Sequence, residues 1–156
     1  MRKRNVVRLL PILLLISLVG CIKKASGPVT PWEKVTTENA VFAQLLDTAT
    51  QGTIAAQTSG LLTVAQTRPV LEFYSQTATI QKQLNTILAQ APSATNIPAV
   101  QTLVTQVNTA AQSLVGSGAL GIKNPKSQQT IGADIQAIVN SVQVILTSYQ
   151  AATGGK

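Results

Sequence analysis

The strongest constraint on the fold is the spacing of apolar residues from residue 70 onwards, which recurs at intervals of three and four. Such spacing places apolar side chains along one side of a helix, where they form a seam against neighbouring helices. Alternation with a period of two, which is typical of half-buried strands, fits the same segments less well. The three seams are Val70, Phe73, Thr77, Ile80, Leu84, Ile87 and Ala91; Val100, Leu103, Val107, Ala110 and Leu114; and Ile131, Ile135, Ile138, Val142, Ile145, Tyr149 and Ala152. The chain is therefore predicted to be all-α, with its helices packed into a bundle.

Helix-capping residues indicate where the helices begin. Thr30 precedes a proline, and Glu33 follows at the third helical position, which is the pattern of a capping box. Asn124 also precedes a proline and is expected to cap the last helix, and Asn96 is expected to cap the third. We predict an antiparallel bundle of four helices near 31–66, 69–90, 97–115 and 125–152, forming one domain over 31–152 with a flexible tail at 153–156.

The end of the first helix has two interpretations. The helix either stops near Thr58, with a break at 59–60 and a new start, or continues to Gln66 and stops before Pro69. The seam that begins at residue 70, extended backwards, misses the apolar residues at 61–64. Pro69 is therefore predicted to mark a break or kink at which the buried face rotates. Small residues in the first helix predict a close approach to a neighbouring helix: Ala49, Gly52, Ala56 and Gly60.

The chain begins like an export signal. Residues 1–8 carry four basic side chains and no acid, and Leu9–Val19 is an uncharged apolar run of eleven residues. A helix that spans a membrane needs about 20 apolar residues, so this run is too short to cross. A basic start followed by an apolar stretch of about 7–15 residues is the layout of a secretory signal peptide. The usual small-x-small cleavage pattern fits poorly, because a cut after Gly20 places Leu18 three residues before it.

The four residues Leu18-Val19-Gly20-Cys21 resemble the lipobox of bacterial lipoproteins, which reads Leu, a small or aliphatic residue, Gly or Ala, and then Cys. The resemblance covers only the first twenty-odd residues. It implies that 1–20 is a signal peptide cut between Gly20 and Cys21. It also implies a covalent lipid on Cys21, with a diacylglyceryl group on the sulfur and an acyl chain on the new amino group.

The residues from the cysteine to Thr30, 21–30, are predicted to be a flexible tether, because they include Gly, Pro and Ser and have no apolar period. The nine residues after the cysteine, 22–30, reach at most about 30 Å. Each buried methylene of an acyl chain contributes about 0.8 kcal/mol, so two or three chains hold the protein permanently on a membrane. The resemblance implies the bacterial cell envelope. Ile22 after the cysteine favours the outer membrane, facing the periplasm, in a Gram-negative cell; a Gram-positive cell would carry the protein on its single membrane.

The charge of the processed chain argues against nucleic-acid binding. Four of the twelve basic residues lie within 1–20, which leaves eight against five acids and a net charge of +3 instead of +7. The remaining basic residues are scattered along the chain and form no stripe that could follow a phosphate backbone. Lys23 and Lys24 stand next to the predicted lipid and are expected to contact headgroups.

The inventory of catalytic side chains is small. The sequence has no histidine, which is the commonest general base and metal ligand. It has neither a Gly-rich phosphate loop after a strand nor a GxSxG elbow, and the glycines at 116–121 follow a helix and predict a turn. The five acids, at dispersed positions, are Glu33, Glu38, Asp47, Glu72 and Asp134. We expect no catalytic residue, no metal site and no cofactor other than the lipid, and hence no enzymatic activity.

The polar faces of the last two helices are unusually poor in charge. Between Ile97 and Val115 there is no charged residue, and between Ser127 and Ala152 only Asp134 is charged. The polar residues of the third helix are Gln101, Thr102, Thr105, Gln106, Asn108, Thr109, Gln112 and Ser113. Compositional bias accounts for such faces, but so does packing against other copies, a membrane protein or glycan, because a neutral face avoids desolvating charges.

The leading hypothesis is a membrane-anchored envelope lipoprotein whose bundle is a non-enzymatic binding or scaffolding module, with a homo-oligomer or another envelope protein as partner. A carrier or sensor of an apolar ligand held between the helices is an alternative. A phage or defence surface lipoprotein that occludes a receptor fits the size and the anchor equally well.

Overall fold

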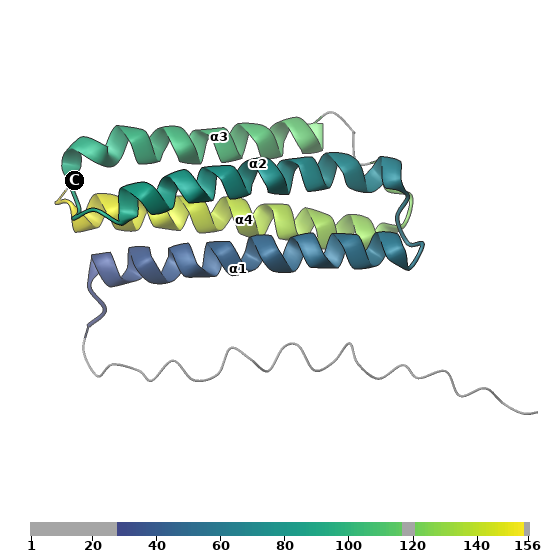
Figure 1. Ribbon diagram of the computed structural model, residues 1–156, viewed down its shortest axis with the longest axis horizontal. Coiled ribbons are helices and arrows are strands. Elements are labelled where there is room, and N and C mark those ends of the chain that lie inside the picture. Colours follow the sequence, from purple (N-terminus) through teal and green to yellow (C-terminus); the bar gives the residue numbers. More distant parts are fainter. Residues whose placement is uncertain (1–27, 117–120, 155–156) are drawn as a thin grey trace, which may run out of the picture.

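A computed structural model of the protein describes residues 28–116 and 121–154. The predicted signal peptide, the lipobox, most of the tether and the last two residues of the tail lie outside these ranges. The described residues form α1 (Pro31–Thr58), α2 (Val64–Leu88), a short 3-10 turn η2 (Ala94–Asn96), α3 (Ile97–Gly116) and α4 (Pro125–Ala152), with no strand among them. Successive helices run in opposite directions (Figure 1), so the predicted all-α antiparallel bundle of four helices is confirmed.

The caps predicted for the first and the last helix are present. The Thr30 backbone N–H donates to Glu33 Oε2 at 2.8 Å, and the Glu33 N–H donates to Thr30 Oγ1 at 3.2 Å, which completes the capping box. At the start of α4, Ser127 N–H donates to Asn124 Oδ1 at 3.1 Å. The cap predicted at Asn96 is wrong, because this residue belongs to η2, which leads directly into α3 and is itself capped by Ser93.

The boundary between the first two helices corrects the predicted ranges 31–66 and 69–90. The break lies at residues 59–63, as in the first of the two interpretations, and Gly60 turns the chain with a φ of +75°, a conformation that glycine adopts without strain. A second capping box then starts α2: the Thr63 N–H donates to Gln66 Oε1 at 2.9 Å, and the Gln66 N–H donates to Thr63 Oγ1 at 3.3 Å.

Pro69 does not break α2, contrary to the prediction. It is the sixth residue of the helix, where its missing N–H leaves one carbonyl, that of the exposed Ala65, without a helical donor. The buried face does not rotate there either, because Thr67 and Val70 belong to the same buried side as the rest of α2. Of the apolar residues at 61–64, Leu62 is buried from the loop, whereas Leu61 and Val64 remain exposed.

The predicted close approach at the small residues of α1 is wrong for its two glycines. A Cβ built on Gly52 or Gly60 would meet no atom within 4 Å. Ala49 is buried in the core and Ala56 packs against it, so the alanines do face a neighbouring helix. Gly52 lies on the exposed side of α1 and Gly60 at the turn, and neither makes the predicted close contact.

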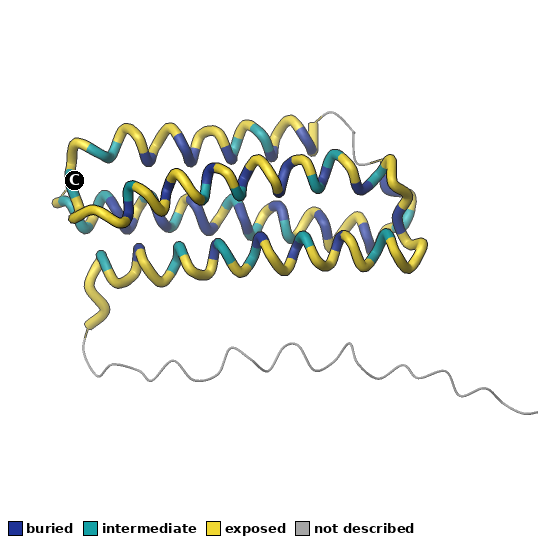
Figure 2. The backbone as a smooth tube through the Cα atoms, in the orientation of Figure 1, coloured by how far each residue is buried: buried dark blue, intermediate teal, exposed yellow. Residues whose placement is uncertain are grey.

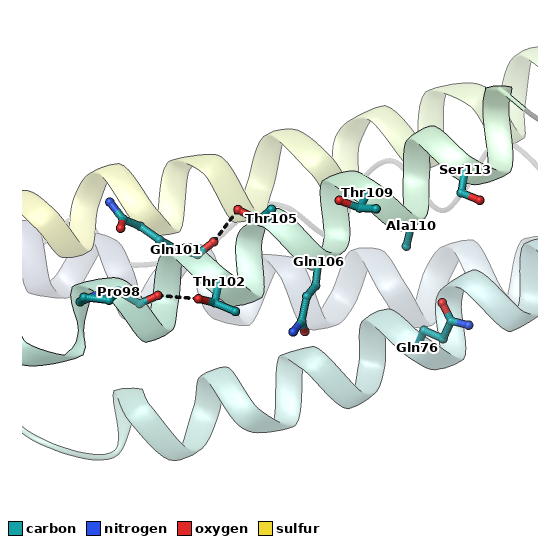
Figure 3. A pocket seen from close by; sticks show the side chains of 9 residues that line it. All are labelled: Gln76, Pro98, Gln101, Thr102, Thr105, Gln106, Thr109, Ala110 and Ser113. Atoms are coloured by element: carbon teal, nitrogen blue, oxygen red, sulfur yellow. Dashed lines mark hydrogen bonds between the residues drawn. The ribbon is translucent and has the colours of Figure 1, made fainter.

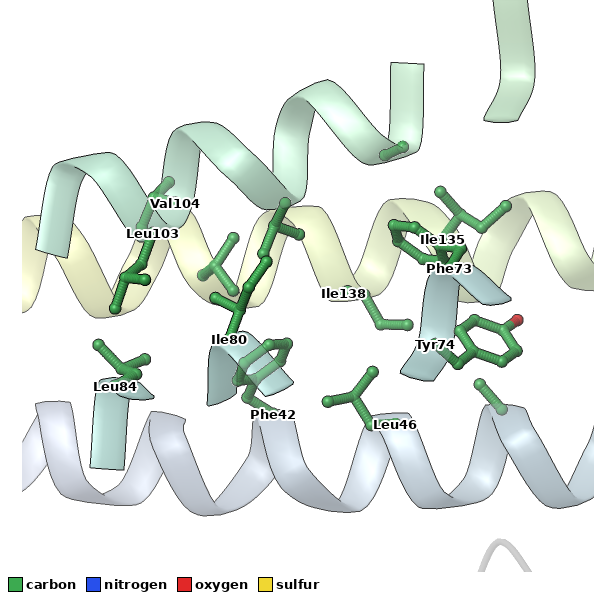
Figure 4. Close-up of a cluster of buried hydrophobic side chains, with 14 of the residues drawn as sticks. Phe42, Leu46, Phe73, Tyr74, Ile80, Leu84, Leu103, Val104, Ile135 and Ile138 are labelled. Atoms are coloured by element: carbon green, nitrogen blue, oxygen red, sulfur yellow. The ribbon is translucent and has the colours of Figure 1, made fainter. Parts of the chain in front are cut away.

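The core runs along the whole bundle (Figure 2), because the seams of all four helices meet on its axis. α1 packs against α2 and α4, and α3 packs against the same two helices. Figure 4 shows Phe42, Ile80 and Leu84 within this cluster, which is mostly aliphatic. At the end of the bundle where α1 starts, the Tyr149 hydroxyl donates to Ser93 O and accepts from Ser93 N–H, both at 3.2 Å, so a loop and a helix end are joined there.

Candidate functional site

The described residues cover the start of the helical domain but not the predicted lipid anchor. Cys21 and the rest of the lipobox lie outside them, and so does the predicted cleavage site between Gly20 and Cys21. Residues 28–30 lead directly into α1. Within residues 28–116 and 121–154, no helix is long and apolar enough to cross a membrane.

The acids are dispersed over the bundle. Glu72 is exposed and pairs with Arg68 at 2.9 Å one turn away on α2. The hydrogen bonds that the Thr30 N–H and hydroxyl donate to Glu33 lower the pKa of that carboxyl. In the part of the chain that the structure describes, no three His, Cys, Asp or Glu side chains come together in a group that could hold a metal ion. Among these acids, Asp134 has an unusual environment because its carboxyl group is partly buried.

A shallow groove between α2 and α3, which we call the α2–α3 groove, is lined entirely by uncharged residues (Figure 3). It has a volume of about 710 Å³; Gln76 lines it from α2, and its other lining residues, among them Gln101, Thr105 and Gln106, come from α3. Further along the same two helices, Gln83, Thr86, Ile87 and Thr102 help to line a second hollow of about 470 Å³. The neutral face that the sequence predicted on the third helix is therefore exposed and continues onto α2.

Two threonine hydroxyls of the α2–α3 groove are already used by their own helix. Thr102 Oγ1 donates to Pro98 O and Thr105 Oγ1 donates to Gln101 O, both at 2.9 Å (Figure 3). A hydroxyl has one proton to donate, so these two side chains offer a partner methyl groups and oxygen lone pairs. The glutamine amides and the hydroxyls of Thr109 and Ser113 carry the remaining donors of the α2–α3 groove.

A second groove, the α1–α4 groove, lies between the C-terminal half of α1 and the N-terminal half of α4. Its volume is about 500 Å³ and its wall is mostly carbon, with Ala55, Ala56, Leu61, Leu62 and Ile131 as its apolar lining residues. The loop between α1 and α2 supplies both leucines, so the loop covers one side of the groove. Sequence reasoning missed this site; the signal was the pair of leucines at 61–62 that fitted no helical seam.

Two buried hydroxyl groups lie next to the α1–α4 groove without a hydrogen-bond partner in the described residues. Thr53, which lines the groove, and Tyr74 of α2 are each 2% exposed. Thr67 is equally buried, but its hydroxyl lies 2.9 Å from Gln57 Oε1. A buried polar group without a partner costs about 1–3 kcal/mol. Such groups are rare in folded proteins and require a specific explanation.

Asp134 brings a carboxyl group to the same place. It lines the α1–α4 groove, and its partial burial raises its pKa. Burial also raises the pKa of Tyr74 to about 12; the neighbouring Thr53 hydroxyl opposes the shift and the negative charge of Asp134 adds to it. The Thr53 and Tyr74 hydroxyls are neighbours in the core and act as each other's hydrogen-bond partner, although their geometry falls outside the ordinary limits. Thr53 and Asp134 line the groove, and Tyr74 lies behind Thr53.

Comparison with known proteins gives no match: no protein-family model fits the chain, and neither a curated protein nor a solved structure matches it.

Proposed function

We propose that this chain is a lipid-anchored protein of the bacterial cell envelope and that its bundle is a non-enzymatic binding module. The observation that carries the binding role is the uncharged α2–α3 groove and the neutral face around it. The anchor rests on the resemblance of Leu18-Val19-Gly20-Cys21 to a lipobox.

The chemistry of the α2–α3 groove favours a protein surface as its occupant. A protein that binds there desolvates no charge, since every residue lining the groove is neutral. Interface centres are depleted in charged residues for the same reason. The open, elongated form of this face along two helices suits an extended surface, and the glutamine amides provide hydrogen bonds that fix its register. We propose another envelope protein with an uncharged surface as the partner.

The tether sets where that partner is found. Nine residues between the lipid and Thr30 reach at most about 30 Å, and the 28 residues of α1 add about 42 Å of helix. The α2–α3 groove therefore lies within about 70 Å of the lipid anchor. In a Gram-negative cell we propose the outer membrane, with the bundle in the periplasm, because Ile22 and not an aspartate follows the cysteine.

Photocrosslinking in intact cells tests the binding face. A photoreactive residue in place of exposed Gln106 on α3 should give a crosslinked adduct, whereas the same residue in place of exposed Gln51 on α1 should give none. Mass spectrometry of the adduct identifies the partner. No adduct from Gln106, or equal adducts from both positions, would contradict the proposed face; an adduct of two copies of this chain would replace the envelope protein by a homo-oligomer.

The substitution Cys21→Ser tests the anchor separately. The variant should lose metabolic lipid labelling and keep its full length, because the sulfur that accepts the lipid is gone. A variant that still appears at the length of the processed chain would refute the lipobox assignment.

A second candidate function, binding of a small ligand with an apolar body, is favoured by the α1–α4 groove. Its volume of about 500 Å³ and its carbon-rich wall are typical of ligand sites. The occlusion of a receptor by a phage or defence lipoprotein has support from the size and the anchor alone.

A further inference from the structure

The end of the bundle opposite to the start of α1 gathers exposed apolar side chains. We call this end the distal tip and define it as residues 59–64, which join α1 to α2, and residues 121–126, which lead into α4 (Figure 1). Six large apolar side chains of the described residues are exposed. Four of the six lie at this end or within about one helical turn of it: Ile54, Leu61, Val64 and Val115.

Apolar surface continues from the distal tip along both sides of α1. On one side Leu61 lines the α1–α4 groove together with Ala55 and Ile131. On the other side Val64 and Leu71 line a hollow of about 340 Å³ between α1 and α2, whose wall is also mostly carbon. Leu61 and Val64 are 54% and 66% exposed. A continuous exposed apolar surface of this kind marks a site that binds a partner or a membrane.

Two lysines stand beside this apolar surface without an acidic partner among residues 28–116 and 121–154. Lys126 lines the α1–α4 groove with Leu61, and Lys123 precedes the cap of α4; both lysines are exposed. The third cation near this end, Arg68, is paired with Glu72. The distal tip is therefore apolar, with unpaired positive charge at its rim.

The two segments of the distal tip are held together. Gln66 Nε2 donates to Gly121 O at 2.8 Å, which joins the start of α2 to the segment before α4. Leu62 and Ile122 are both buried in the core, so one apolar side chain fixes each segment. The exposed side chains and the lysines thus belong to one surface.

We infer that the distal tip binds the surface of an anionic lipid bilayer, with Leu61 and Val64 buried among the lipids and Lys123 and Lys126 at the headgroups. Burial of apolar side chains and attraction of lysines to anionic lipids add up in proteins that lie on a membrane surface. A neutral bilayer would leave the lysines without a counter-charge. An acidic protein would match the lysines, but it would need an apolar cavity for both exposed side chains, whereas a bilayer adapts to their shape.

The inference rests on the proposed lipid anchor, which supplies the bilayer. A tether of at most about 30 Å lets the bundle lie along the membrane, because one helix is only about 10 Å wide. Leu61 and Lys126 lie on the α1–α4 side. Since α1 and α3 each pack against α2 and α4, the α2–α3 groove is on the opposite side of the bundle. It therefore faces away from the membrane and stays open to its protein partner.

A fluorescent probe tests the contact in the full chain as isolated from cells. An environment-sensitive fluorescent amino acid in place of exposed Ala65, next to Val64, should shift its emission to the blue on vesicles of phosphatidylglycerol and not on vesicles of phosphatidylcholine. The same amino acid in place of exposed Gln83, about 28 Å along α2, should show no shift on either. No shift from position 65 on phosphatidylglycerol, or equal shifts on the two lipids, would overturn the inference.

The same experiment separates this inference from the proposed function. The emission at position 65 is read whether or not Cys21 carries lipid, and the mass of the chain decides the anchor. Loss of the Gln106 crosslink with the tip signal intact would refute only the α2–α3 proposal. A photocrosslink from position 65 to an acidic protein in cells, with no shift on vesicles, would replace the bilayer by that protein.

Paired substitutions resolve the two parts of the distal tip. Leu61→Ser with Val64→Ser should abolish the blue shift, and Lys123→Gln with Lys126→Gln should abolish the preference for phosphatidylglycerol. The matched controls are Val41→Ser and Lys82→Gln, which change an exposed valine and an exposed lysine away from the tip and should leave the shift unchanged. Equal losses in tip and control variants, or an unchanged preference in the folded lysine variant, would overturn the assignment. The helical circular dichroism of each variant establishes that it is folded.

Discussion

The two grooves of this bundle differ in how their hydroxyl groups are used. In the α2–α3 groove, Thr102 and Thr105 donate to their own backbone, and no lining residue is charged. In the α1–α4 groove, the hydroxyl of Thr53 makes no hydrogen bond of ordinary geometry, its neighbour is the equally buried Tyr74 hydroxyl, and the carboxyl of Asp134 lines the wall. Two hydroxyls of the first groove are therefore bonded to their own backbone, whereas the buried hydroxyl of the second is not.

The difference teaches that the number of polar residues in a segment does not determine how many of their polar groups remain free to bind a partner in the folded protein. A face rich in threonine and glutamine has fewer free hydrogen-bond donors than its composition suggests, because the hydroxyls of Thr102 and Thr105 donate to their own helix. In the groove with a mostly carbon wall, Ser59 and Thr130 also donate to their own helix, and the Thr53 hydroxyl alone among the lining groups is buried without a hydrogen bond of ordinary geometry. The first suits an extended neutral surface, and the second suits a compact ligand with an apolar body.

The largest expected effect comes from the core that both grooves share. Phe42 is fully buried in the cluster that includes Ile80 and Leu84 (Figure 4). Phe42→Ala should lower the free energy of unfolding by about 3–5 kcal/mol, through lost burial and the cavity that remains. Chemical denaturation measures the change. If the bundle is one cooperative unit, crosslinking from the α2–α3 groove and helical circular dichroism should be lost together on heating; separate losses would show that the groove unfolds independently of the rest.

The next effect separates the grooves through matched threonines. Thr53→Val removes a buried unpaired hydroxyl and should raise the free energy of unfolding of the ligand-free protein by about 1–3 kcal/mol. Thr105→Val removes an exposed hydroxyl bonded to Gln101 O and should change it by less than about 0.5 kcal/mol. Denaturation of both variants in parallel measures the contrast, and a destabilised Thr53→Val variant would show that its hydroxyl has a partner in the folded protein.

A smaller effect comes from two exposed helical glycines. A Cβ on either Gly52 of α1 or Gly132 of α4 meets no atom within 4 Å, so each change to alanine should stabilise the protein by about 0.5–1 kcal/mol. Gly52 lines the α1–α4 groove and Gly132 does not. The added methyl should therefore narrow the groove in Gly52→Ala alone. Thermal unfolding measures the stability of both variants, and a loss of stability in either would contradict the open space beside that glycine.

The smallest effect is in the pH dependence, since Asp134 is only partly buried and Glu33 is exposed. The pKa of Asp134 is raised above its ordinary 3.8, so folding loses stability as the pH rises through the range between 3.8 and the raised value. Asp134→Asn should therefore be more stable than the wild type at neutral pH and equal to it well below pH 3.8.

The contribution of Glu33 to the pH dependence of stability has the opposite sign. Its pKa is lowered below the ordinary 4.5 by the Thr30 hydrogen bonds, so it stabilises the fold above pH 4.5 and this contribution disappears as the pH falls through the lowered value. Glu33→Gln should be less stable than the wild type at neutral pH and approach it in acid. Thermal unfolding across the pH range measures both carboxyls, and shifts of the same sign would contradict the assigned environments.

Helix type and number could be predicted from the sequence because the seams repeat over many turns, so that single exceptions do not disturb them. The boundary at Thr63 could have been predicted too, since Thr63 and Gln66 have the spacing of a capping box. Pro69 obscured it. A proline in the second turn removes one backbone hydrogen bond, whereas the capping box satisfies two donors, and the cap decided where α2 begins.

The α1–α4 groove could not be predicted in the same way. Thr53 lies 81 positions before Asp134, and Tyr74 comes from a third helix. No spacing rule within one helix relates them. Leu61 and Leu62 looked like misplaced seam residues because the loop that carries them has no period; one of them is buried in the core and both line the groove.

The sequence by itself determined the helices, their antiparallel order and the neutral face of α3, because each depends on residues within a few turns of one another. The tertiary structure decided which threonine hydroxyls are internally bonded, which are buried without a partner, and that α1 and α4 lie next to each other. The physical reason is that burial and hydrogen-bond satisfaction depend on atoms contributed by distant segments, and these meet only when the helices pack.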